Sequence, residues 1–274
     1  MSHYYNENLE PCHKVKRTDG KGLRDTTVRD AKKNNWFPSV TTIFSLLNKD
    51  GLFDWKAEKV LRTALTKRQE VGEEWDKYVQ RILNEAEKVQ AMESGQDKGS
   101  FYHNLLEQYY QSINTNTLGK LLDTLEVKDL EIIQEVANTV FPLYSTLPLT
   151  EEVQFISEKT FVSTSYGYAG TIDLIINTDD TVFIIDFKSK NTTDLKKFVT
   201  YETHLMQLCA YQYGIPELLP AEGKKRRLLN ILFSSIEPGI IKVKEWDDKE
   251  MEKGAKMFFA LLDYWQYKND YCPS

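Results

Sequence analysis

The pattern of apolar and polar positions divides the chain into a helical part and a part rich in strands. From about residue 53 to residue 145, apolar residues recur at steps of three and four, as in LEIIQEVANTV. This spacing predicts amphipathic helices, with an interruption at ESGQDKGS. The segment WFPSVTTIFSLLNK places Ser39 at a predicted helix start, directly after a proline. Residues 1–35 are polar and charged and predict a loop or a short ribbon.

After Pro148 the pattern changes to that of strands. The stretch VQFISEKTFVS alternates, and GTIDLIINTDDTVFIIDFKSK, residues 170–190, has two apolar runs around a polar tip, which predicts a β-hairpin. A helix over 194–213 follows, then strands in RRLLNILFSSI and GIIKVKEWD and a final helix in DKEMEKGAKMFFALLDYWQY. The order β-β-β-α-β-β-α predicts an α/β fold with a mixed central sheet flanked by helices. Its helix 194–213 would be a right-handed crossover between parallel strands.

The chain is therefore expected to have three parts. Residues 1–35 form an N-terminal extension, residues 36–147 a helical region, and residues 148–274 an α/β core that ends in a helix. The helical region and the core are expected to form one integrated domain, because neither a repeat nor a low-complexity linker separates them.

Composition narrows the class of protein. Hydrophobic residues make up 41% of the 274 residues, which is enough for a packed core. The net charge of −6 excludes a generic DNA-coating protein, so any nucleic acid would be bound through local basic patches. Three distant cysteines without a CxxC pair argue against a zinc ribbon, an iron–sulfur cluster and a disulfide framework. No signal peptide or apolar run of membrane-spanning length is recognised, so an intracellular protein without a membrane anchor is expected.

The hairpin carries an aspartate in each of its apolar strands. In the expected antiparallel register, residues whose numbers add to 359 face each other, so Asp173 lies opposite Asp186. Lys188 shares the face of Asp186, because strands alternate with a period of two. Two carboxylates that face each other repel and destabilise a sheet unless their charge is neutralised. A bound Mg²⁺ or Mn²⁺ would neutralise it, since these ions prefer oxygen ligands. The alternative is a solvated hairpin edge, but the flanking Ile and Phe residues of Asp186 argue against it.

A lysine beside such a metal suits phosphodiester hydrolysis. Its ammonium group can orient the attacking water or neutralise the charge that develops on the phosphate. Taken alone, Lys188 would be read as a solvated lysine at a strand end, so the neighbouring carboxylates carry this interpretation.

Several motifs in the same order resemble the PD-(D/E)XK nuclease superfamily. Gly170-Thr-Ile-Asp173 precedes Asp186-Phe-Lys188 by thirteen residues, and Gly99-Ser-Phe-Tyr-His103 resembles the upstream histidine motif of the RecB-like branch. Gln207-Leu-Cys-Ala-Tyr211 resembles the Q-x-x-x-Y motif of that branch. Pro38-Ser-Val-Thr-Thr42 is similar to a segment of phage and mitochondrial-genome-maintenance-type exonucleases. The resemblance covers roughly residues 36–215 and implies a restriction-endonuclease-like core with an N-terminal helical cap region.

The resemblance also implies roles for individual residues. Asp173, Asp186, His103 and the backbone carbonyl of Phe187 would hold the metal, and Lys188 would be the catalytic lysine. A helix can hold the neutral imidazole of a histidine rigidly as a ligand, although a histidine in this position is otherwise more often a partly buried or capping residue.

The helix after the catalytic strand would line the active site. Gln207 and Tyr211 are four residues apart and share a helix face, from which they would contact a phosphate or a base edge. Packing of this helix on the sheet, with Tyr211 in the core, is compatible with the same role.

Other residues have weaker support. Glu107 lies one helical turn after His103 and is either a partner of His103, a residue near a second metal, or a surface glutamate. Glu158 matches a glutamate that the family often has on the strand before the hairpin. Lys190 is expected to contact a phosphate of the substrate. Ser39 and Thr41 could bind a phosphate at a helix start, or they are ordinary capping residues.

The expected function is that of a metal-dependent deoxyribonuclease. The chain lacks the four cysteines that clamp some relatives with an iron–sulfur cluster, so a stand-alone, cluster-free exonuclease is expected. A helical cap over the site would favour single-stranded or frayed DNA with free ends, in recombination, repair or genome processing. An endonuclease of the same fold and a non-catalytic nucleic-acid-binding protein remain as alternatives.

Overall fold

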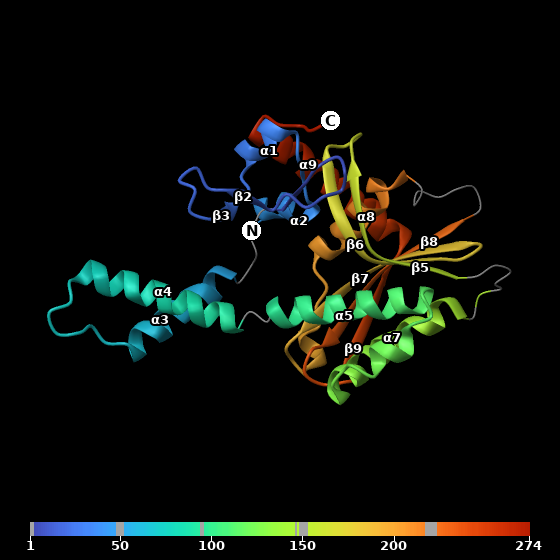
Figure 1. Ribbon diagram of the computed structural model, residues 1–274, viewed down its shortest axis with the longest axis horizontal. Helices are drawn as coiled ribbons and strands as arrows, with labels where there is room; N and C mark the ends of the chain where they lie inside the picture. Colours follow the sequence, from blue (N-terminus) through green and yellow to red (C-terminus); the bar gives the residue numbers. More distant parts are fainter. Residues whose placement is uncertain (1–2, 48–51, 94–95, 146, 148–152, 217–223) are drawn as a thin grey trace. The chain divides into compact units, whose positions relative to one another are not determined.

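A computed structural model describes residues 3–47, 52–93, 96–145, 147, 153–216 and 224–274 of the protein (Figure 1). The described residues fall into two compact units. One unit comprises residues 1–46 and 101–274, and the other comprises residues 47–100. The predicted boundaries at residues 35 and 147 do not coincide with the boundaries of these units, because the prediction rested on the change of pattern along the chain. Residues 148–152, where the predicted core begins, lie outside the described residues.

The described part of the smaller unit contains two complete helices besides the first residues of α5 (Gln96–Asn114). They are α3 (Leu52–Thr66) and α4 (Trp75–Glu93). Arg81 on α4 donates to both carboxylate oxygens of Glu73 in the connecting loop, at 2.9 and 2.8 Å, which ties the loop to the helix. The two helices agree with the helical spacing of apolar residues in this part of the sequence.

The larger unit is built on a five-stranded sheet. Its strands, in their spatial order, are β5 (Gln154–Ser163), β6 (Tyr168–Asn177), β7 (Thr181–Lys190), β8 (Lys225–Ser234) and β9 (Ile241–Trp246). Strands β7 and β8 are parallel, and the other neighbours are antiparallel. The predicted mixed α/β sheet is therefore confirmed.

The crossover between β7 and β8 contains a shorter helix than the sequence predicts. Helix α8 spans Glu202–Gly214, whereas the predicted helix begins at residue 194. The Asp194 side chain accepts a hydrogen bond from the Lys196 backbone N–H at 3.0 Å and closes a short 3₁₀ turn, Leu195–Lys197. Phe198, directly after this turn, is fully buried, so the segment is fixed by packing before the helix starts.

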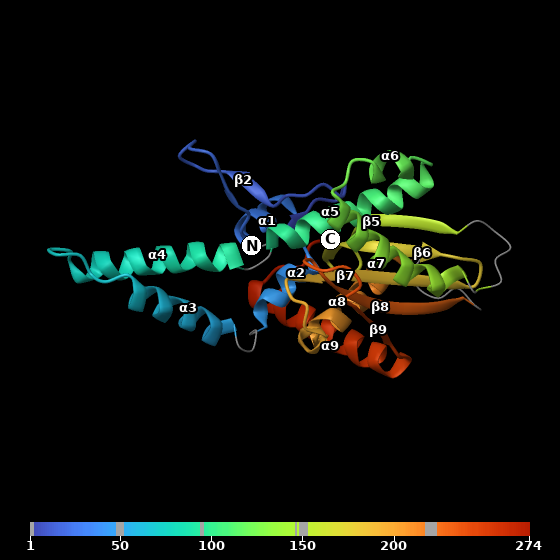
Figure 2. The ribbon, with the colours of Figure 1, turned by 90° about the horizontal axis from the view of Figure 1, so that it is seen from below.

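Helices cover both faces of the sheet (Figures 1 and 2). On one face, α8 and α9 (Asp248–Asn269) share a core with Ile184 and Leu228. On the other face, α5 (Gln96–Asn114) and α7 (Val127–Ser145) share a core with Phe187 and Leu229. The short helix α6 (Leu118–Leu122) connects α5 and α7. The sheet is apolar on both sides, as expected for a buried central layer.

The N-terminal segment adds small elements to the same unit. They are β1 (Tyr4–Tyr5), β2 (Lys14–Lys16), β3 (Leu23–Asp25), α1 (Val28–Asn34), β4 (Phe37–Pro38), α2 (Val40–Ile43) and the 3₁₀ turn Phe44–Leu46. Strand β1 pairs with β4, and β2 pairs with β3 as the predicted short ribbon. None of the described helices combines the length and the apolar character needed to cross a lipid bilayer.

Candidate active site

The β6–β7 hairpin has the predicted register. Leu174 pairs with Ile185 and Asn177 with Val182, so residue numbers add to 359 throughout the ladder. The ladder ends one position before Asp173 and Asp186. There the backbone N–H of Phe187 donates to the Asp173 carboxylate, Oδ2, at 2.7 Å. The backbone pairing of the two strands thus stops at residues 174 and 185, and the Asp173 side chain is the acceptor for the Phe187 N–H.

Strand alternation also breaks beside Asp173. Phe155 and Phe161 are both on β5, an even number of residues apart, yet they pack in the cores on opposite faces of the sheet. On β6, Ile172 and Leu174 differ in the same way. Glu158 lies on β5 between Phe155 and Phe161, and its φ of +47° is rare for a residue with a side chain. Such backbone conformations are held by their surroundings and are concentrated at functional sites.

The break brings three potential metal ligands together. One ligand atom each of His103, Glu158 and Asp173 lies within 4.8 Å of the others. His103 comes from α5, and its Nδ1 atom is 3.4 Å from Asp173 Oδ2. Two hard carboxylate oxygens and an imidazole nitrogen form a donor set that suits Mg²⁺ or Mn²⁺, so these residues fit a divalent cation.

Negative charge dominates this ligand group. Burial, and then the nearby carboxylates of Asp173 and Glu107, raise the pKa of Glu158 to about 7. Burial alone would raise the pKa of Asp173, but His103 and Lys188 lower it overall. Burial would lower the pKa of His103, and Asp173 reverses this and raises it. Asp173 therefore favours the protonated form of His103.

Asp186 lies in a different environment on β7. Its side chain is fully buried, and Oδ1 accepts from the Lys188 ammonium at 2.6 Å. Oδ2 accepts from the side-chain amide of Asn230 on β8, at 2.7 Å, and Trp246 Nε1 donates to the Asn230 carbonyl oxygen at 2.8 Å. Because β7 and β8 are paired in register, Asp186 and Asn230 are direct neighbours. This series of hydrogen bonds, from Trp246 through Asn230 and Asp186 to Lys188, fixes the orientation of the Asp186 carboxylate.

Charge is balanced locally in this group. Burial raises the pKa of Asp186 to about 6, although Lys188 opposes the shift. Burial would lower the pKa of Lys188, but Asp186 and Asp173 raise it overall. Lys188 is therefore held as a cation, and its side chain remains 27% exposed while that of Asp186 is not exposed at all. A cation anchored on its buried side and open on the other is placed to receive an anionic group.

Helix α8 contributes Gln207 and Tyr211 beside the carboxylates. Both side chains are buried, and the Gln207 amide donates to the Tyr211 hydroxyl. Burial, and then the charges of Asp186 and Asp173, raise the pKa of Tyr211 well above its usual value. Gly170 permits this packing, because a Cβ atom at residue 170 would lie 3.0 Å from Tyr211 Cε1 and 2.9 Å from Phe161 Cε1.

The remaining predicted residues have local partners. Glu107 accepts a hydrogen bond from Gln111 at 2.9 Å, and Lys190 donates to the carbonyl of Lys197 at 2.7 Å. Ser39 caps α2, since its hydroxyl accepts from the Thr42 backbone N–H at 3.1 Å. Thr41 is exposed next to it. The structure thus gathers His103, Glu158, Asp173, Asp186, Lys188, Gln207 and Tyr211 in one region.

Sequence reasoning did not single out two polar residues of this region. The patterns around Asn230 and Trp246 predict strands but indicate no role for either residue. An asparagine inside the run RRLLNILFSSI is an available signal, because a buried amide needs partners. Its partner could not be named without the register between β7 and β8.

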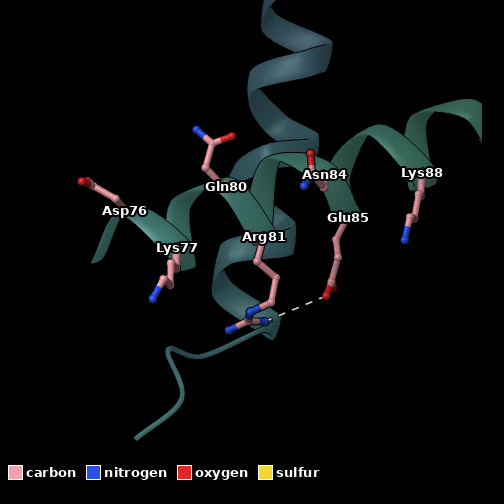
Figure 3. Close-up of a pocket in the computed structure, with 7 residues that line it drawn as sticks. All are labelled: Asp76, Lys77, Gln80, Arg81, Asn84, Glu85 and Lys88. Atoms are coloured by element: carbon pink, nitrogen blue, oxygen red, sulfur yellow. Dashed lines mark ion pairs between the residues drawn. The ribbon is translucent and has the colours of Figure 1, made fainter. Parts of the chain in front are cut away.

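A separate hollow lies on the smaller unit. Figure 3 shows the seven side chains that line it, all from α4: Asp76, Lys77, Gln80, Arg81, Asn84, Glu85 and Lys88. Arg81 and Glu85 form an ion pair at 3.9 Å across one helical turn. Basic and acidic groups of a single helix neutralise one another here, so the hollow lacks the concentrated negative charge of the carboxylate region.

Comparison with protein families agrees with the site geometry. A family model for the PD-(D/E)XK nuclease superfamily matches residues 74–271. The chain belongs to the PD-(D/E)XK nuclease superfamily. The superfamily inferred from the motifs is thereby confirmed, and nucleases of this superfamily act on phosphodiester bonds with divalent metal ions. The matched range contains all the residues that the structure gathers around Asp173 and Asp186.

Two solved structures are similar to this nuclease at low identity. One is the crystal structure of a protein named "Putative exonuclease" from Eubacterium rectale. It has 13% identity over 62% of this chain and 68% of that chain, with a TM-score of 0.36. The other is the crystal structure of SSO0001, with 16% identity over 58% of this chain and 74% of that chain and a TM-score of 0.23. No curated protein matches the chain.

Proposed function

We propose that this nuclease is a Mg²⁺- or Mn²⁺-dependent exonuclease of the RecB-like branch that degrades single-stranded or frayed DNA from free ends. The observation that carries the proposal is the grouping of His103, Glu158 and Asp173 beside the Lys188–Asp186 ion pair. The exonuclease activity and the preference for single strands rest on the order of the sequence motifs. A role in recombination, repair or genome processing follows from the same resemblance.

The metal would be held by residues from four elements, α5, β5, β6 and β7. In this proposal His103, Asp173, Asp186 and the Phe187 carbonyl are ligands, and Glu158 adds a carboxylate on the side of His103. When bound, a divalent cation neutralises negative charge on the phosphate and lowers the pKa of water. It would also relieve the repulsion that raises the pKa of Glu158 to about 7.

Lys188 would act through its charge. The raised pKa of Lys188 keeps the ammonium protonated, so the lysine stabilises negative charge on the scissile phosphate rather than accepting a proton. Asp186 holds the ammonium group, and Asn230 holds Asp186. The lysine is thus positioned before the substrate arrives, which reduces the reorganisation that the reaction requires.

The α8 residues would contact the substrate strand. The Tyr211 hydroxyl lies beside the carboxylates, and its buried hydrogen bond to Gln207 orients both groups. We propose that they bind a phosphate or a base edge next to the scissile bond. Lys190, Ser39 and Thr41 are proposed as further phosphate contacts, with weaker support because each has a local structural partner or an exposed position.

The test compares linear and circular single-stranded DNA of the same sequence. End-labelled substrates are incubated with the protein in Mg²⁺, in Mn²⁺ and in EDTA, with Lys188→Ala as the inactive control. We expect metal-dependent degradation of the linear substrate only, and no degradation by Lys188→Ala. Cleavage of the circle at a similar rate would instead indicate an endonuclease. DNA binding without any cleavage would indicate a non-catalytic role.

A further inference from the structure

A basic surface lies in the N-terminal part of the larger unit, outside the range matched by the family model. Residues 14–33 contain eight basic and three acidic residues, a net charge of +5 in a chain whose net charge is −6. The rest of the chain therefore has a net charge of −11. Positive charge is concentrated in the β2–β3 ribbon and α1, which we call the basic ribbon segment.

The acidic residues of the basic ribbon segment are all paired. Asp25 forms a salt bridge with Lys14 at 2.6 Å, and Asp19 forms one with Arg17 at 3.2 Å. Asp30 accepts two hydrogen bonds from Arg24, at 2.6 and 2.8 Å. Five basic residues of the segment have no salt bridge to an acidic residue in the described part of the chain: Lys16, Lys21, Arg29, Lys32 and Lys33.

The paired residues hold the segment in shape. Arg24 is on β3 and Asp30 is on α1, so their two-pronged contact fixes the ribbon against the helix. The Thr26 hydroxyl donates to the Cys12 carbonyl at 2.5 Å and closes the base of the ribbon. The five unpaired side chains are all exposed, and Figure 2 shows β2 extending from its unit as a projection. An exposed two-stranded ribbon has no core of its own, so its charges rather than its packing define its surface.

The basic ribbon segment connects to the candidate active site through a short series of contacts. The Tyr5 hydroxyl is 3.2 Å from the Thr171 hydroxyl, and Thr171 is two residues before Asp173 on β6. The His13 ring contacts the Tyr5 ring edge-on, with centroids 5.1 Å apart, and Lys14 follows His13 in the chain. The base of the ribbon is therefore linked by contacts to β6, the strand that carries Asp173.

We propose that the basic ribbon segment binds the phosphate backbone of the DNA strand that enters the active site. The inference rests on the proposed function. Five unpaired cations in a fixed arrangement complement the regular negative charge of a nucleic acid backbone, and such contacts bind without regard to base sequence. The rest of the chain, with its net charge of −11, would repel the same strand. The segment compensates for this repulsion beside the site of cleavage.

The test measures the salt dependence of DNA binding. The protein carries Lys188→Ala to prevent cleavage, and its binding to a fluorescein-labelled 30-nucleotide poly-dT is followed by anisotropy between 50 and 300 mM salt. One variant adds Lys16→Gln, Lys21→Gln and Lys32→Gln. A matched control adds Lys249→Gln, Lys253→Gln and Lys256→Gln on α9, which removes the same net charge from another exposed surface.

We expect the ribbon variant to lower the slope of log affinity against log salt by about 2, since each contact with a single strand contributes roughly 0.7. The control is expected to keep the slope of the parent protein. Melting temperatures equal to that of the parent would exclude unfolding as the cause. An unchanged slope in the ribbon variant, or an equal loss in the control, would overturn the inference. Cleavage of linear DNA by the unsubstituted protein tests the nuclease proposal separately, so the two can fail independently.

Discussion

The two halves of the candidate active site balance charge in opposite ways. On the β5–β6 side, Glu158 and Asp173 share a single histidine, and the pKa of Glu158 is raised to about 7 by burial and neighbouring carboxylates. On the β7–β8 side, the buried Asp186 is matched by Lys188 and Asn230. The first half has excess negative charge that a cation would relieve. In the second half the protein itself balances the charge of Asp186, so this proposed metal ligand is already oriented and Lys188 is held ready for an anion.

This difference shows how a nuclease site can combine two requirements. A group of ligands with unbalanced negative charge gains stability when a metal binds to it. A group that must stabilise charge in the transition state works best when it is already ordered. Removing charge should therefore have opposite effects on stability in the two halves, and the following experiments test this.

The largest effect is expected from Lys188→Ala on cleavage. Loss of the positioned ammonium should reduce the cleavage rate about 10²- to 10³-fold, as for other groups that stabilise transition-state charge. The metal-dependent rise in melting temperature should remain, since the lysine is not a ligand. Rates on linear DNA and thermal melts with and without Mg²⁺ measure both. Lys190→Ala is the control and should cost less than tenfold. A variant at residue 188 with more than a tenth of the parental rate would contradict the assigned role.

Asp186→Ala should give the largest loss of stability. It leaves the Lys188 ammonium and the Asn230 amide without their buried partner. Breaking such a pair costs several kcal/mol, and the partial exposure of Lys188 reduces this to about 2–3 kcal/mol. Urea unfolding in EDTA measures the loss. The double variant Asp186→Ala/Lys188→Met should recover part of it, because no unpaired charge remains. Equal stability of the single and double variants would argue against the ion pair as the cause.

Asn230→Ala should destabilise the same half by a smaller amount. The substitution removes the partner of Trp246 Nε1 and of Asp186 Oδ2, and an unsatisfied buried group costs about 1–3 kcal/mol. Cleavage should also slow, because the carboxylate that orients Lys188 loses its own support. Urea unfolding and cleavage rates measure the two effects. Asn269→Ala, which removes an amide at the end of α9 that donates to a backbone carbonyl, is the control. Full activity of Asn230→Ala would show that Asn230 is not needed to position Lys188.

Glu158→Gln should stabilise the metal-free protein. The pKa of Glu158 is about 7 in the folded state, against an ordinary value of 4.5. The folded state thus retains a proton that the unfolded state has lost, and its stability falls as the pH rises from about 4.5 through 7. The advantage of the glutamine variant should grow over this window and then level off. It should reach on the order of 1 kcal/mol, because the partial exposure of the carboxyl weakens the effect.

The same variant should bind metal more weakly. Its melting temperature should therefore rise less in Mg²⁺ than that of the unsubstituted protein. The stability difference between the two proteins should shrink in Mg²⁺ or change sign. Glu131→Gln on α7 is the control, since Glu131 is exposed and is not part of the three-ligand group. Thermal melts in EDTA and in Mg²⁺ between pH 4.5 and 8.5 measure both effects. A glutamine variant that is less stable than the parent at every pH would contradict excess negative charge in this half.

Much of the fold could be predicted because its signals are local. The hairpin register follows from the polar tip and the two apolar runs, and residues 174 and 185 pair as expected. The start of α8 was missed because the 3₁₀ turn at Asp194 and the burial of Phe198 depend on packing rather than on helical periodicity. Glu158 has weaker support in the sequence because a glutamate on a strand commonly faces solvent, and no local pattern indicates its φ of +47°.

The sequence by itself determined the order of the elements and the register of the hairpin that carries Asp173 and Asp186. Both depend on short stretches whose spacing and turn residues restrict the backbone. Only the tertiary structure decided which partners each aspartate acquires. Asp173 meets His103 from α5, seventy residues away in the chain, and Asp186 meets Asn230 through the parallel pairing of β7 with β8. Contacts of this kind depend on how distant segments pack, and no local pattern specifies them.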